Sequence, residues 1–210
     1  MTPSNSLYLY LGLSMKLGRP LEYNPEQTIE IAMHLYWRKG YGDTTLKDIL
    51  DATGISKSSF YHAFGSKFQL FERCIERYRD RQLGQMMATL KQASSGRSFI
   101  ENFLYDIEKT ANNDNQHGYF VTSTAFEFSE CGHYPEVAIL ISKAKMSFAE
   151  VFKLAIIRGQ SEHVISEHKD PTELSLFIIS NIAGLRTMIK SKVEPRNIRS
   201  VITIVLSALD

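Results

Sequence analysis

The sequence predicts an all-α protein, and three observations support that prediction. Helix-start signals recur along the 210 residues, each with a capping side chain directly before an apolar pattern. The apolar residues that follow repeat at the three- and four-residue spacing of a helix buried on one face. No two segments read convincingly as the strands of a β-hairpin.

The first predicted helix begins after Asn24, because a capping residue is followed there by Pro25 at the first helical position. Gly40 ends it. The residues of its apolar stripe are Ile29, Ala32, Met33 and Tyr36.

Two short helices come next. Thr45 caps the first, with Asp48 in the capping-box position, and this helix runs to residue 53 before Gly54. Ser56 caps the second, which continues through Phe64. The pair is therefore separated by only a short turn that contains a glycine.

Longer helices make up the rest of the chain. Ser66 and Gln69 form another capping box, which opens a helix to about Lys91. The segment 119–128 is short and apolar, and its content of β-branched and aromatic residues is compatible with a strand as well as a helix. Counted as a helix, it is the sixth of nine, the others being predicted over 98–112, 136–158, 170–190 and 194–209.

The overall composition is that of an ordinary globular protein, with 43% hydrophobic residues, 22% charged residues and a formal net charge of +1. No run approaches the ~20 apolar residues that span a bilayer. The N-terminus lacks the features of a secretory signal. We expect residues 1–17 to be a disordered extension, and the segment that begins at Met15 reads like the start of a protein, which indicates Met15 as the true initiator; a genuine short N-terminal arm is the alternative. Two cysteines are too few for a disulfide framework, which indicates a cytoplasmic protein. Because no run is long enough to span a bilayer, we expect no membrane partner.

The segment 52–71 stands out from this balanced background because it contains no carboxylate. Two short helices joined by a glycine-containing turn form a helix-turn-helix. Gly54 can adopt the positive φ that the turn requires, and Ile55 fills the angle between the helices. The side chains expected on the inner face are Ile49, Ile55, Phe60 and Ala63.

The outer face of the second short helix then carries hydrogen-bond donors and apolar contact surfaces without any acid. Such a helix fits the DNA major groove, where residues near its N-terminus read base edges. Helix N-termini bind anions, so phosphate contacts are expected from Thr45 and Lys67, with Tyr61 and His62 as two more. The side chains expected on the outer and flanking positions are Lys57, Ser58, Ser59, Tyr61 and His62.

Another interpretation must be weighed, because short helix pairs occur in many folds and a polar helix face is usually only solvated. The chain could be an all-α ligand-binding or protein-interaction module whose helix-turn-helix no longer binds DNA. The clustering of donors on three consecutive helix starts favours DNA binding instead.

Residues 18–78 resemble the N-terminal DNA-binding domain of the TetR family of bacterial transcriptional regulators. The resemblance rests on Trp-Arg-Lys-Gly-Tyr at 37–41, Thr-Thr at 44–45, Ser-Lys-x-x-x-Tyr-x-x-Phe at 56–64 and Gly-Ser-Lys at 65–67. It implies a homodimer with a three-helix DNA-binding domain (18–66) and a six-helix domain for ligand binding and dimerisation (67–210). The implied partners are a pseudo-palindromic operator in double-stranded DNA and a small-molecule effector, with no cofactor.

The resemblance also implies roles for individual residues. Base or groove contacts fall on Lys57, Ser58 and Ser59. Phosphate contacts fall on Thr45, Tyr61, His62 and Lys67. The implied activity is that of a regulator, most often a repressor, that leaves its operator when it binds a ligand.

Aromatic residues on the segments expected to surround the ligand cavity are candidates for its lining. Aromatics at helical spacing are also typical of an ordinary core, so both interpretations stay open. The candidates are Phe103, Phe120, Phe126 and Phe148.

A thiol-based redox or electrophile sensor on the same scaffold is the alternative function, working through Cys74 or Cys131. A subset of the family has a cysteine where this chain has Tyr119, so the sensing tied to that position is not expected here. The sequence predicts no metal site and no enzyme, because it lacks a second ligand pair beside Cys131 and His133 and lacks nucleophile-elbow, phosphate-cradling and HExxH motifs.

Overall fold

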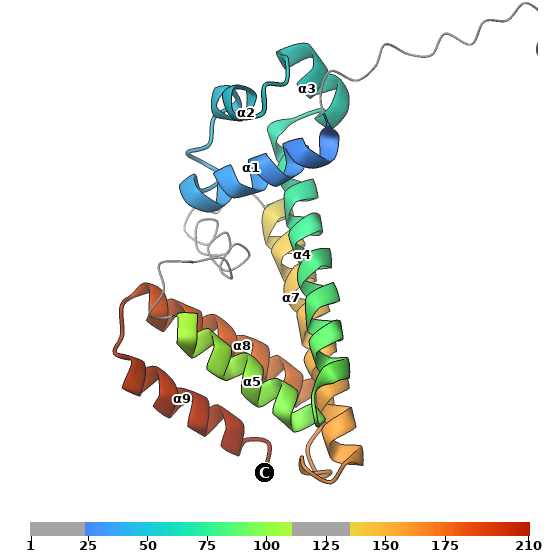
Figure 1. The fold of residues 1–210 in the computed structure, drawn as a ribbon, viewed down its shortest axis with the longest axis vertical. Helices are drawn as coiled ribbons and strands as arrows, with labels where there is room; N and C mark the ends of the chain where they lie inside the picture. Colours follow the sequence, from blue (N-terminus) through green and yellow to red (C-terminus); the bar gives the residue numbers. More distant parts are fainter. Residues whose placement is uncertain (1–23, 111–134) are drawn as a thin grey trace, which may run out of the picture.

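The computed structural model describes residues 24–110 and 135–210, and all regular structure in these two ranges is helical (Figure 1). The all-α prediction is therefore confirmed. The extension predicted at 1–17 and the ambiguous element at 119–128 lie outside the described residues. The helices are α1 (Pro25–Lys39), α2 (Leu46–Thr53), α3 (Lys57–Phe64), α4 (Lys67–Gln92), α5 (Gly96–Thr110), α7 (Pro135–Ser161), α8 (Pro171–Lys190) and α9 (Pro195–Ser207).

Capping side chains satisfy the first backbone amides of α1, α2, α3, α4, α5 and α8, whereas α9 begins without a side-chain cap. The Asn24 carboxamide oxygen accepts hydrogen bonds from two backbone amides in the first turn of α1 at 3.0 and 3.3 Å. The Asp170 carboxylate accepts from two amides in the first turn of α8 at 2.8 and 2.9 Å. α5 begins at Gly96, two residues earlier than predicted. The reason is a reciprocal cap in which Ser98 N donates to Ser95 Oγ at 3.0 Å and Ser95 N donates to Ser98 Oγ at 2.9 Å.

Two long helices, α4 and α7, run side by side along the molecule and connect its two ends (Figure 1). α1, α2 and α3 gather at one end, while α5, α8 and α9 pack together toward the other. The predicted boundary between residues 66 and 67 falls at Ser66, the N-cap of α4. Because α4 packs on α1 and on α7, any movement of this helix would change contacts at both ends of the molecule.

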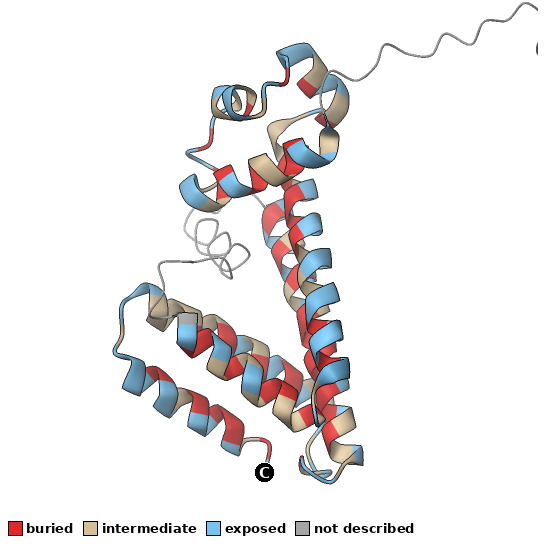
Figure 2. Ribbon diagram, viewed as in Figure 1, coloured by how far each residue is buried: buried red, intermediate tan, exposed pale blue. Residues whose placement is uncertain are grey.

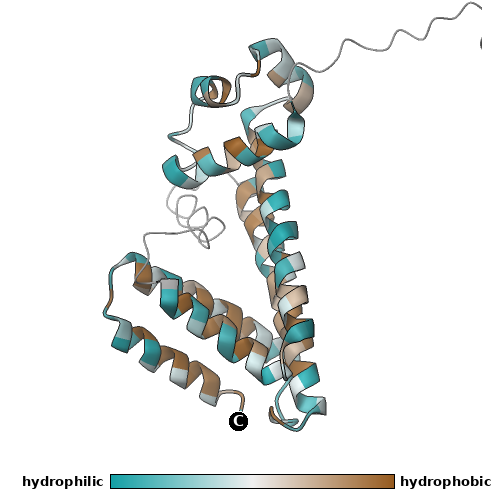
Figure 3. Ribbon diagram, in the orientation of Figure 1, coloured by the Kyte–Doolittle hydropathy of each residue, from teal (hydrophilic) through white to brown (hydrophobic). Residues whose placement is uncertain are grey.

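Buried side chains form a stripe along α4 and α7 and continue into both ends (Figure 2). Near α1 the core centres on Tyr36 and Phe71, whose rings meet edge to face at 5.1 Å. In the other half Phe99 and Phe152 lie 5.8 Å apart. The hydropathy pattern follows the same division, with the apolar faces of α5, α8 and α9 turned toward their neighbours (Figure 3).

The start of α5 lies unusually close to α7. A Cβ added at Gly96 would sit 1.9 Å from the carbonyl oxygen of Ala155, so only glycine fits at this contact. Gly96 N also donates to Glu162 Oε2 at 2.8 Å, and Arg158 donates to the Leu90 carbonyl at the end of α4 at 2.7 Å. These contacts fix the junction of α4, α5 and α7.

In the described ranges we find no helix that is both long and apolar enough to cross a membrane.

Candidate nucleic-acid interface

The turn between α2 and α3 has the geometry of a helix-turn-helix. Gly54 follows α2 with φ of +70°, and Ile55 lies in the angle between the helices with 4% of its surface exposed. Ile49 and Phe60 are fully buried on the inner face, and Ala63 is half-buried beside them. All four residues predicted for the inner face therefore point inward.

The opposite face of α3 is exposed. Lys57, Ser58, Tyr61 and His62 are exposed, and their spacing places them on one side of the helix. Tyr61 is 47% exposed and leans its ring edge-on against the buried Phe60 ring at 5.5 Å. Charged and polar donors thus stand on a face that a rigid core holds in place.

Ser59 differs from these neighbours because it takes part in the cap of α3. It is half-buried, its backbone amide donates to Ser56 Oγ at 3.1 Å, and its hydroxyl oxygen accepts from the Ser56 hydroxyl at 2.9 Å. The Ser59 hydroxyl proton has no role in that cap and remains able to donate outward.

Thr45 is exposed at the start of α2, but its hydroxyl is already used. It donates to Asp48 Oδ2 at 2.7 Å and accepts from Asp48 N at 3.1 Å. The Thr45 backbone amide donates to Asp48 Oδ2 at 2.8 Å, which completes the predicted capping box. The Asp48 carboxylate also pairs with Lys39 at 2.8 Å, and the hydrogen bond from Lys39, followed by those from Thr45, lowers the pKa of Asp48. A phosphate at this helix start would therefore be met by the amides of the first turn.

Lys67 was predicted to contact phosphate, but in the structure its side chain contacts the turn after α1. Its ammonium donates to the carbonyls of Tyr41 at 2.8 Å and Thr44 at 2.9 Å, and it lies 4.1 Å from the centre of the Tyr41 ring. The turn after α1 presents two carbonyl oxygens and an aromatic face, and each of these groups interacts favourably with a cation. Lys67 thus braces the start of α4 against that turn, and its phosphate contact stays a prediction.

A network of ion pairs fastens α1 to α4, and the sequence analysis did not identify it. Arg77 pairs with Glu26 and, at 3.1 Å, with Glu30, while Arg81 pairs with Glu30 at 2.8 Å. Burial by itself would raise the pKa of Glu30, but the hydrogen bonds from the two arginines lower it. The four-residue spacing of both the acids and the arginines was the available signal. We call these four residues the α1–α4 clasp.

A small cavity, partly open to solvent, lies between α4, α5, α7 and α8, with a volume of about 60 Å³ for the centres of water-sized molecules. Two of the four predicted lining residues, Phe103 and Phe148, line this cavity, while Phe120 and Phe126 are not among the described residues. The polar lining residues escaped the sequence analysis, because nothing local distinguishes them from a solvated face. The described residues that line it are Tyr78, Gln82, Met86, Phe103, Lys145, Phe148, Ile179, Ile182, Ala183 and Arg186.

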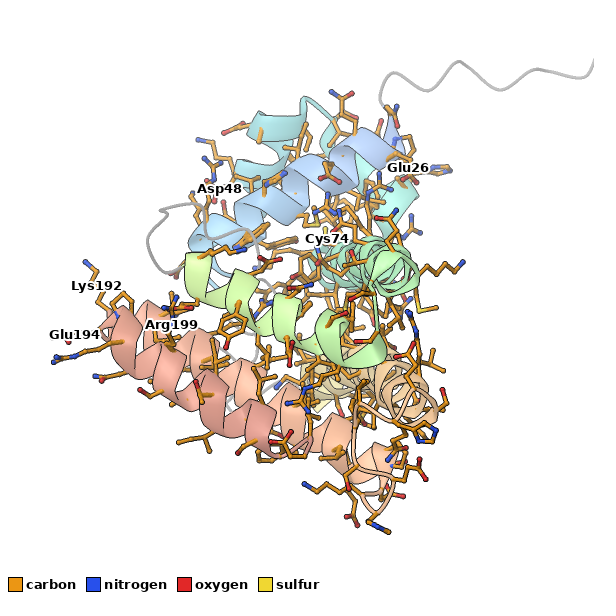
Figure 4. All side chains as sticks on the ribbon, turned by 60° about the horizontal axis from the view of Figure 1, so that its bottom comes forward. Glu26, Asp48, Cys74, Lys192, Glu194 and Arg199 are labelled. Carbon is orange, nitrogen blue, oxygen red and sulfur yellow. The ribbon has the colours of Figure 1, made fainter. Side chains whose placement is uncertain are left out.

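Cys74 lies where α1 and α4 meet and has no exposed surface (Figure 4). Its thiol donates to the Ile29 carbonyl at 3.5 Å, and burial raises its pKa. A buried thiol of raised pKa is a poor nucleophile, so the structure does not favour a sensor that works through Cys74. Cys131, the other candidate, lies beyond the described ranges. Residues 24–110 and 135–210 hold no group of three His, Cys, Asp or Glu side chains able to bind a metal.

Comparison with known proteins agrees with this geometry. Residues 29–74 match the family model described as bacterial regulatory proteins, tetR family. The uncharacterized HTH-type transcriptional regulator YezE of Bacillus subtilis is 20% identical over 92% of this chain and all of its own length. The HTH-type transcriptional repressor ComR of Escherichia coli is 25% identical over 80% of each chain.

Solved structures show the same fold. The TetR family transcriptional regulator CifR, as a cysteine mutant complexed with 26-bp double-strand operator DNA, superposes with a TM-score of 0.76. The match covers 91% of this chain and all of CifR at 23% identity. The helix-turn-helix, the long α4 and the helical layer beyond it are thus shared along nearly the whole length, and within that fold residues 29–74 match the DNA-binding domain of the tetR family of bacterial regulatory proteins.

Proposed function

We propose that this DNA-binding transcriptional regulator is a repressor that leaves its operator when a small molecule occupies the cavity between α4, α5, α7 and α8. The observation that carries the proposal is the exposed donor-bearing face of α3 on a buried helix-turn-helix core. ComR, named a repressor, and CifR, solved with operator DNA, support it. The protein would act in the cytoplasm, and no catalytic activity is assigned to it.

The proposed DNA contacts divide by position on the helix-turn-helix. Lys57, Ser58 and Ser59 occupy the first turn of α3 and read base edges in the major groove. Tyr61 and His62 lie one turn further and contact flanking phosphates, as does the start of α2 at Thr45. Lys67 serves the same interface indirectly, because its carbonyl contacts fix where α4 begins relative to α2.

A homodimer is proposed because α8 and α9 present an outer surface of apolar and small side chains. On α8 the exposed positions include Phe177, Ser180 and Gly184, and a Cβ at Gly184 would meet nothing within 4 Å. On α9 Ile204 is 67% exposed. Small residues let helices of two copies approach closely, and a two-fold pair would place two α3 helices about 34 Å apart on a pseudo-palindromic operator.

Ligand release is proposed to act through Tyr78. Tyr78 lines the cavity, and on its other side it meets Trp37 of α1 edge to face at 6.3 Å. A ligand that binds one position of α4 better than another would shift the population toward that position. The helix-turn-helix moves with α1, so the spacing between the two recognition helices would change.

Selection of genomic fragments followed by fluorescence anisotropy at two salt concentrations tests the DNA-binding part. We expect an enriched palindromic sequence and an affinity that falls steeply with salt. Lys57→Ala and Ser58→Ala should change which bases are preferred. Lys143→Ala, an exposed lysine on α7, is the matched control and should change nothing. Recovery of no enriched fragment would contradict the proposal.

Sedimentation measures the dimer independently. Phe177→Asp on the proposed interface should give a monomer, while Ile139→Asp, on an exposed position of α7, should leave the dimer intact. If the two variants had the same oligomeric state, the dimer interface would not lie at Phe177.

A further inference from the structure

We propose that the ligand of the cavity between α4, α5, α7 and α8 is a small organic anion, a carboxylic acid with an apolar body. This inference rests on the proposed function and deepens it by naming the effector's chemical class. It follows from which side chains line the cavity and from their charge.

Most of the lining is apolar. Tyr78 and Phe148 are buried and contribute aromatic surface from α4 and α7, and Phe103 adds a third ring from α5. Met86, Ile179 and Ile182 complete the wall. A cavity of this kind gains affinity by removing apolar ligand surface from water, so the greater part of the ligand must be apolar.

Two cations interrupt this lining, and they come from different helices. Lys145 lies on α7, one turn before Phe148, and Arg186 lies on α8, one turn after Ile182. Both are half-buried, and no carboxylate is among the described residues that line the cavity. Among the described residues no hydrogen bond or ion pair joins Lys145 to another side chain. The described lining of the cavity therefore carries two positively charged side chains and no negatively charged one.

The charge of Arg186 acts inside the cavity. Burial raises the pKa of the Tyr78 hydroxyl, and the positive charges of Arg186 and Arg81 oppose that rise. An anion in the cavity would meet the same field.

A carboxylate suits this arrangement better than a neutral group. Cations held in a largely apolar environment lose hydration, and an anionic ligand restores that loss with charge-assisted hydrogen bonds. The guanidinium of Arg186 can bind both carboxylate oxygens at once, and the Lys145 ammonium can bind one of them from the facing helix. A ligand ammonium would meet repulsion from both. The structure thus selects for an acid with an aromatic or aliphatic body.

Binding of matched probe pairs tests the inference. The probes are benzoate, 2-naphthoate and octanoate, each beside its neutral primary amide, titrated by calorimetry and by the fluorescence of Trp37, the sole tryptophan. We expect at least one acid to bind with a Kd below about 1 mM and at least tenfold tighter than its amide. Binding of no acid, or equal binding of acid and amide, would overturn the proposal.

Substitutions then test whether Lys145 and Arg186 bind the carboxylate of the acid. Lys145→Met and Arg186→Met should each weaken acid binding about tenfold or more while leaving amide binding within about twofold. Lys143→Met, exposed on the same helix as Lys145, should leave both unchanged. Acid binding that survives both substitutions would place the anion elsewhere and refute the proposal. Lys145 provides the decisive result if the Arg186 variant fails to fold, which circular dichroism detects.

The failure of this inference is distinguishable from failure of the proposed function. Anisotropy with a selected genomic fragment, measured without any probe, reports DNA binding alone. A protein that binds DNA but none of the acids refutes only the ligand class. A protein that binds the acids through Lys145 and Arg186 but no DNA refutes the proposed function and keeps the ligand class.

Discussion

Replacement of Lys67 by methionine separates the two roles that this lysine can have. The structure gives its ammonium two backbone carbonyl partners and an aromatic ring within the DNA-binding end, whereas its place at a helix start predicts a phosphate contact. Methionine keeps an unbranched chain of comparable length and removes the charge. The bracing role predicts a loss of stability, and the phosphate role predicts a loss of salt dependence.

The expected loss of stability follows from the contacts. A hydrogen bond from a charged donor contributes about 1.5–3 kcal/mol net, and because Lys67 is only half-buried we take the lower end for each of its two bonds. The sum is about 3 kcal/mol, which for a chain of this length corresponds to a fall in Tm of about 6–12 °C. The cation–π contact, about 0.5–1 kcal/mol at such a site, lies within this range.

The assay combines thermal unfolding at fixed protein concentration with operator titrations over a series of salt concentrations. Each phosphate contact contributes about 0.9 to the slope of log affinity against log salt, so loss of one contact in each protomer of a dimer would reduce the slope by about 1.8. For Lys67→Met we expect the fall in Tm, weaker binding to all sequences alike and an unchanged slope. Lys57→Met, exposed on α3, is the control and should keep its Tm within a degree or two of the parent.

The opposite pattern would refute the bracing role. If Lys67→Met lowered Tm by less than about 2 °C and reduced the slope by about 1.8, the lysine would be shown to leave its carbonyl partners and contact phosphate.

Four further outcomes are expected. Gly96→Ala should destabilise by about 2 kcal/mol or more, since the added methyl group would overlap a backbone carbonyl of α7. Gly84→Ala, in the exposed middle of α4 with no atom within 4 Å of the new Cβ, should stabilise by about 0.5–1 kcal/mol; denaturant titration measures both. Unfolded Cys74 loses its proton above about pH 8.5 while the buried thiol keeps it, so stability falls as pH rises. Between neutral pH and pH 9.5 the free energy of unfolding of the parent should therefore fall by about 1.4 kcal/mol more than that of Cys74→Ala. Trp37→Phe should keep the ligand affinity but reduce the release of DNA by ligand, and equal release in parent and variant would contradict the route through Tyr78.

Local signals in the sequence were sufficient for the helices and for the helix-turn-helix. Thr45, Ser56 and Ser66 cap helices within three residues of themselves, so the information for each start lies in a few consecutive positions. The same holds for Gly54, whose positive φ is a property of one residue, and for the exposed positions on α3, which follow from helical spacing.

Features that depend on tertiary contact could not be found in the same way. Lys67 stands in the first turn of α4, and only the folded chain brings the turn after α1, 23 to 26 residues away, within reach of its ammonium. Lys145 and Arg186 are separated by about 40 residues and look like solvated charges in isolation, because the cavity exists only once α7 and α8 are packed. The early start of α5 was missed for a local reason, since Ser95 and Ser98 cap each other without any acidic residue.

The α1–α4 clasp has a consequence for how salt affects this protein. Its ion pairs are partly exposed, so raising the salt concentration screens them as it screens the contacts with phosphate. Salt would then weaken the operator complex in two ways. Its ions would compete with the protein for the DNA phosphates, and they would weaken the packing of α1, and with it the helix-turn-helix, on α4. The salt slope of the parent protein therefore exceeds what its phosphate contacts alone would produce. Differences in slope between variants with an intact clasp cancel this second contribution and count phosphates directly.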